Sequence, residues 1–157
     1  AWDTSNVKNM GDLFNDAKVF NSTLSLWDVS NVVTMASMFS GAEAFNSDLG
    51  GWNVSAVMDM EKMFQNAASF NSDLSAWDTS NVKNMGDLFN DAKVFNSTLS
   101  LWDVSNVVTM ASMFSGAEAF NSDLGGWNVS AVMDMEKMFQ NAASFNSDLS
   151  AWDTSNV

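Results

Sequence analysis

The sequence contains no cysteine, no histidine and no arginine, and these absences exclude several classes of protein. Without cysteine there is no disulfide framework, and the redox compartment cannot be read from the sequence. Six lysines against 19 acidic residues give a net charge of −13, which argues against binding to nucleic acid or to anionic membranes. No apolar run approaches the roughly 18 residues needed to cross a membrane.

The sequence is instead dominated by repetition. Residues 76–150 repeat residues 1–75 without a difference, and each 75-residue block contains three 25-residue units. The units span 1–25, 26–50, 51–75, 76–100, 101–125 and 126–150, with a partial unit at 151–157. A fixed short period predicts a single continuous solenoid over residues 1–157. Because neither end carries an atypical capping unit, we expect the chain to be a window of a longer array.

The positions of a unit, numbered 1 to 25, divide into a constant apolar set and a variable polar set. Trp is constant at position 2, Met at position 10, and Phe at positions 14 and 20. This division predicts an inside and an outside for each coil. The predicted core residues of the first three units are Trp2, Trp27, Trp52, Met10, Met35, Met60, Phe14, Phe39, Phe64, Phe20, Phe45 and Phe70.

Two periodicities coexist within a unit. The segment 24–29 alternates inward and outward residues, which predicts a short strand. Met35, Met38, Phe39 and Ala42 follow helical spacing, which predicts a short helix that begins after position 9 and ends near position 16. Stacked coils of strand, turn and short helix predict a leucine-rich-repeat-like solenoid with one parallel sheet. A three-faced parallel β-helix also fits, because both folds stack short strands.

The motif that carries the strongest resemblance is Trp-Asp-Val-Ser-Asn-Val-x-x-Met-x-x-Met-Phe-x-x-Ala-x-x-Phe-Asn-x-x-Leu, clearest at 27–49. It resembles the 25-residue repeat of BspA-like leucine-rich-repeat surface proteins, a group that includes mycoplasma-type lipoprotein repeats of unknown function. The resemblance covers the whole chain and implies an exported protein displayed on the cell surface. It supplies no catalytic residues. The units here are more uniform than those of an ordinary adhesin, which favours a structural fibre.

Several polar residues are candidate sites. Carboxylates stacked one coil apart are candidates for sharing Ca²⁺, with a solvated acidic face as the alternative. These carboxylates belong to Asp3, Asp28, Asp48 and Asp73. The glycosylation sequons begin at Asn53, Asn128, Asn21 and Asn96, and position 3, held by Asn53, is expected to face outward. The Asn column formed by Asn21, Asn46, Asn71 and their copies is expected to form an internal hydrogen-bonded ladder.

These features predict a structural extracellular or cell-surface protein that forms or sheathes a filament or layer. Its expected partner is a further copy of itself, stacked end to end. The alternative is an adhesin that binds a host surface protein or glycan through an exposed face. Enzymatic activity is not expected, because the carboxylates recur on a regular surface with no histidine and no unique cleft.

Overall fold

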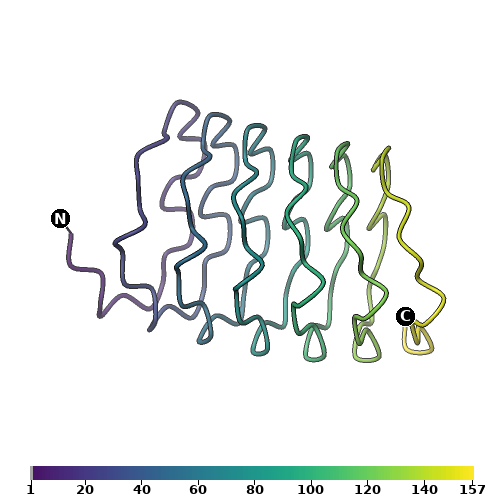
Figure 1. The fold of residues 1–157 in the computed structure, drawn as a ribbon. Coiled ribbons are helices and arrows are strands. Elements are labelled where there is room, and N and C mark those ends of the chain that lie inside the picture. The colour runs from purple at the N-terminus through teal and green to yellow at the C-terminus, as the bar shows by residue number, and fades with distance from the viewer. Residues whose placement is uncertain (1) are drawn as a thin grey trace.

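The chain forms a row of coils, one for each 25-residue unit, which lie side by side from the N-terminus to the C-terminus (Figure 1). The computed structural model describes residues 2–157. Within these residues there is no α-helix and no β-strand. The only sheet-like elements described are isolated parallel bridges between position 9 of successive coils, which join Asn9, Thr34, Asp59, Asn84, Thr109 and Asp134. The predicted strand-and-helix solenoid of the leucine-rich-repeat type is therefore wrong.

The predicted helix, which begins after position 9 and ends near position 16, is replaced by consecutive turns. Its left-handed end is confirmed, since Gly41 at position 16 has φ of +69°, but Ser37 at position 12 is left-handed as well, with φ of +56°. A left-handed residue in the middle of the segment interrupts a right-handed helix. The amide of Phe39 therefore donates to the carbonyl of Met63 in the next coil, at 2.9 Å, instead of to the carbonyl of Met35 four residues earlier.

Alternate amides of this segment all point to the same neighbour. In the coil 26–50, the amides at positions 10, 12, 14 and 16 donate to carbonyls of the following coil at 2.7–3.0 Å. The intervening amide of Met38 closes a turn on the carbonyl of Met35 at 3.1 Å. Each coil therefore satisfies half of this segment's amides within itself and half through its neighbour.

The predicted strand at 24–29 is also absent, and with it the alternative of a three-faced β-helix. Its inward and outward alternation exists, because Val29 is buried while Asp28 is exposed. However, the amide of Trp27 closes a turn on the carbonyl of Leu24 at 2.9 Å, and Val32 does the same on Val29. Amides used in local turns cannot form a ladder with the next coil.

The core consists of aromatic columns that run through the stack. Phe39 and Phe64 lie 5.6 Å apart between coils, and Phe39 and Phe45 lie 4.0 Å apart within one coil. Of the predicted core residues, the structure buries Met10, Met35, Met60, Phe39, Phe45, Phe64, Phe70 and Trp52. Phe14, Phe20 and Trp27 are partly buried, and Trp2 is 71% exposed. The less buried residues belong to the first two coils, where fewer neighbours cover them.

The columns generate a stability prediction. Phe39→Ala removes a fully buried ring from three stacking contacts and should lower the free energy of unfolding by about 3–5 kcal/mol. Val19→Ala is the control, because Val19 is 91% exposed and its truncation should change stability by less than about 0.5 kcal/mol. Denaturant unfolding measures both, and a similar effect of the two substitutions would contradict the described core.

Candidate functional site: the contact between successive coils

Side chains replace the backbone ladder between coils at positions 21–25. The amide of Asn71 donates to Oδ1 of Asn46 in the preceding coil at 2.8 Å, and the same bond recurs from Asn46 to Asn21 at 2.9 Å. The predicted Asn ladder thus exists, but it is not internal, because these residues are exposed. It holds adjacent coils in register from the surface.

The constant Ser at position 22 completes this contact in the opposite direction. Oγ of Ser97 accepts the amide of Leu74 in the preceding coil at 3.1 Å, and Oγ of Ser122 accepts that of Leu99 at 2.9 Å. The role of this Ser as an acceptor was not predicted from the sequence. The signal was its presence in all six complete units, which a turn alone does not require.

The Trp column contributes polar contacts as well as packing. Nε1 of Trp77 donates to the carbonyl of Leu49, 28 residues earlier in the chain, at 3.0 Å, and Nε1 of Trp102 donates in the same way to the carbonyl of Leu74 at 2.9 Å. Because the buried indole N–H has a partner, Trp is tolerated in the core without an unsatisfied donor. Trp therefore joins the coils both by burial and by a hydrogen bond.

The acidic residues have local structural roles that account for their type. Fifteen of the 19 acidic residues are Asp, and eleven of these accept the backbone amide of the residue two positions on. The other four, Asp12, Asp16, Asp87 and Asp91, have positive φ. The short Asp side chain suits both tasks. Each of the four Glu residues instead pairs with a Lys.

The candidate calcium residues all serve as such turn acceptors. Asp3, Asp28, Asp48 and Asp73 bind the amides of residues 5, 30, 50 and 75 at 2.9–3.1 Å. Within residues 2–157, no group of three or more acidic, His or Cys side chains is arranged to hold a metal ion.

Hydrogen bonds from Ser shift the titration of several of these carboxyls. The hydroxyl and the amide of Ser30 lower the pKa of Asp28, and those of Ser80 lower the pKa of Asp78. The same turn is formed at position 3 by Asn53, whose Oδ1 accepts from the amide of Ser55 at 3.2 Å and from its hydroxyl at 2.7 Å. The turn thus forms with either a carboxylate or an amide.

The sequon asparagines lie in two different surroundings. Asn53 and Asn128 are exposed at position 3, where Oδ1 holds the turn. Asn21 and Asn96 are exposed in the Asn column, where Oδ1 accepts the amide of the next coil. In both surroundings the oxygen is engaged and the side chain faces solvent.

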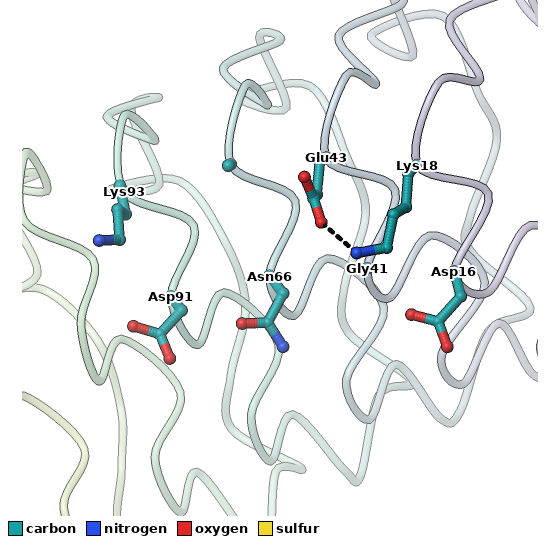
Figure 2. A pocket seen from close by; sticks show the side chains of 8 residues that line it. Asp16, Lys18, Gly41, Glu43, Asn66, Asp91 and Lys93 are labelled. Atoms are coloured by element: carbon teal, nitrogen blue, oxygen red, sulfur yellow. Dashed lines mark hydrogen bonds and ion pairs between the residues drawn. The ribbon is translucent and has the colours of Figure 1, made fainter.

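A polar groove with a volume of about 510 Å³ crosses four coils at positions 16 and 18 (Figure 2). Nζ of Lys18 forms an ion pair with Oε1 of Glu43 in the next coil at 2.8 Å, which raises the pKa of Lys18. The carboxylate of Asp16 occupies the space that a Cβ on Gly41 would need. Asp91 lies in the same way over Gly116, so this fit recurs every 75 residues.

The fit between Asp16 and Gly41 can be tested by substitution. Gly41→Ala adds a Cβ to a left-handed residue and also meets the Asp16 carboxylate, so it should destabilise by more than the roughly 1–2 kcal/mol expected for left-handed Ala. Asn66→Ala is the control. Asn66 is the left-handed residue at position 16 of the next coil, so this change also introduces a left-handed Ala at position 16. Denaturant unfolding should show partial recovery when Asp16→Gly is added to Gly41→Ala. Equal costs for the two Ala variants would contradict the fit.

The lowered pKa values predict acid sensitivity. The folded-state pKa of Asp28 and Asp78 lies below the unfolded value of about 3.9, so their contribution is present above that value and is lost as the pH falls through the folded pKa. Asp28→Asn with Asp78→Asn should therefore lose less stability between pH 6 and pH 2.5 than the parent chain. The reverse change, Asn53→Asp, should lose more. Parallel urea-unfolding profiles across this pH range would contradict the assignment.

Comparison with known proteins places the chain in a family. The model of the family described as "Mycoplasma protein of unknown function, DUF285" matches residues 1–96 and again residues 70–157. No curated protein and no solved structure matches the chain. In the part of the chain that the structure describes, no helix is long and apolar enough to cross a membrane. The two matches together span the repeats, and the chain belongs to the DUF285 family of mycoplasma-type proteins of unknown function.

Proposed function

We propose that this protein is a structural component of the cell surface, in which coils stack into a filament or a sheathing layer. The observation that carries the proposal is the self-complementarity of the coil. Each inner coil offers the amides of positions 10, 12, 14 and 16 on one side and the carbonyls of positions 9, 11, 13 and 15 on the other. Any further copy of the unit therefore fits the face that an existing unit presents.

The resemblance of the motif to BspA-like surface proteins supports the extracellular setting. The uniformity of the units supports a structural role over recognition of one partner, because the residues of 76–150 duplicate those of 1–75. An array of identical contacts strengthens with each added coil.

The last complete coil shows what a stacking partner would cover. Phe70 is fully buried between two neighbours, whereas its copy Phe145 is only partly buried, and the same is true of Met60 and Met135. Residues 151–157 cover only part of this face, through Trp152, which stacks on Trp127 at 6.4 Å. A further copy stacked here would cover the remaining apolar surface and accept hydrogen bonds from the outward amides, in a heterologous contact that propagates.

The proposal predicts self-association of the 157-residue chain that increases with concentration and with salt. Salt should strengthen it because screening reduces the repulsion between chains of net charge −13. Sedimentation velocity should show growing oligomers, and negative-stain images should show rods one coil stack wide. A monomer that is independent of concentration and salt would contradict the proposal.

Matched variants locate the contact. Phe145→Lys places a charge on the partly open face and should abolish association, whereas Leu101→Lys adds the same charge to an exposed side chain on the flank of an inner coil and should not. Asn146→Ala keeps the apolar face and removes only the Oδ1 acceptor that the next Asn amide would use, so it should weaken association less. Loss of association in the Leu101→Lys variant would show that charge alone controls association.

A further inference from the structure

The Asn column leaves a row of hydrogen-bond donors on the surface. Oδ1 of Asn71 is fixed by the amide of Asn96 at 2.8 Å, and Oδ1 of Asn96 is fixed by the amide of Asn121 at 2.9 Å. Because the oxygen must face the donating amide, Nδ2 is directed away from it. Within residues 2–157, no protein group accepts a hydrogen bond from Nδ2 of Asn71 or Asn96.

These donors lie in grooves on the same face of the stack. One groove has a volume of about 510 Å³ and is lined by Asn71, Asp73, Ser75, Asn96, Ser97, Thr98 and Leu101. A second, of about 330 Å³, is formed two coils further on by Asn121, Asp123, Asn146, Ser147 and Asp148. The first groove thus brings together two side-chain amides, one carboxylate and three hydroxyl groups, and the side chain of Leu101, which also lines it, is 80% exposed.

We propose that this face binds a linear, neutral polysaccharide, a binding activity beyond the structural role proposed above. Sugar hydroxyls both donate and accept, so Nδ2 of Asn71 and the carboxylate of Asp73 suit neighbouring hydroxyls of one ring. Leu101 offers an apolar surface to the C–H groups of the sugar. The recurrence of the groove along the stack lets one chain occupy both hollows, which raises the overall affinity.

The same groups argue against other ligands. An extended peptide would need free backbone groups to pair with, but here the amide of Leu74 is bound by Ser97 and that of Asn96 by Asn71. An anionic polymer would meet Asp73, Asp123 and Asp148 on a chain of net charge −13. A neutral, hydroxyl-rich chain satisfies the donors without this repulsion.

The test uses the 157-residue chain produced in a host without N-glycosylation, since Asn96 begins a sequon. Affinity gel electrophoresis with a soluble β-glucan and a soluble α-glucan should show retardation by at least one, and polygalacturonate should show none. Absence of retardation by both neutral polymers, or stronger retardation by polygalacturonate, would overturn the proposal.

Isosteric variants decide which groups bind. Asn71→Asp with Asn96→Asp keeps an oxygen for the ladder and replaces the outward donor, so affinity should fall at least tenfold. Asn53→Asp with Asn128→Asp adds the same charge at position 3, where Asp is already common, and should leave affinity unchanged. Leu101→Ala, a change on an exposed side chain that leaves the fold intact, should lower affinity severalfold. If the parent chain, the double variant Asn71→Asp with Asn96→Asp, and Leu101→Ala bind the polysaccharide equally, the binding site lies outside this groove.

Discussion

Every other feature of this fold depends on the hydrogen bonds that each coil makes to the next. A coil built only of turns leaves many amides and carbonyls without local partners, and buried groups of this kind are costly when unpaired. Here the backbone supplies partners at positions 8–19, while Asn, Ser and Trp supply them elsewhere. The 25-residue period is therefore a requirement of pairing as well as of packing, since a shift of one residue would separate donors from acceptors along the whole coil.

The same requirement explains which parts of the structure were predictable from the sequence. The constant apolar residues identify the inside, and inner-coil residues such as Phe64 and Met60 are fully buried. The spacing of Met35, Met38 and Phe39 predicted a helix, which is wrong, because successive tight turns also direct residues inward at that spacing. A helix and a series of turns differ in the acceptor of each amide. For Phe39 this acceptor lies 24 residues away, and local periodicity in the sequence does not reveal it. The left-handed conformation of Ser37 and Lys62 gives no signal either, because neither residue type favours it.

Local structure accounts for more of the charged surface residues than the composition suggests. A net charge of −13 would suit a cationic partner, yet most Asp residues hold a turn and the Glu residues pair with Lys. Of the candidate sites, the calcium residues are used in turns, whereas the Asn column has an unassigned outward donor beside a groove. Sequence reasoning identified the column but not its exposure, because its position outside the core depends on the path of the turn.

In this structure the amides at positions 10, 12, 14 and 16 pair with the next coil and not with their own. Scalar couplings transmitted through hydrogen bonds, measured by NMR on isotope-labelled chain, identify the acceptor of each amide directly. The structure predicts a coupling between the amide of Phe64 and the carbonyl of Leu88, and between that of Lys62 and the carbonyl of Gly86. A coupling from the amide of Phe64 to the carbonyl of Met60, four residues earlier, would show a helix and contradict this account.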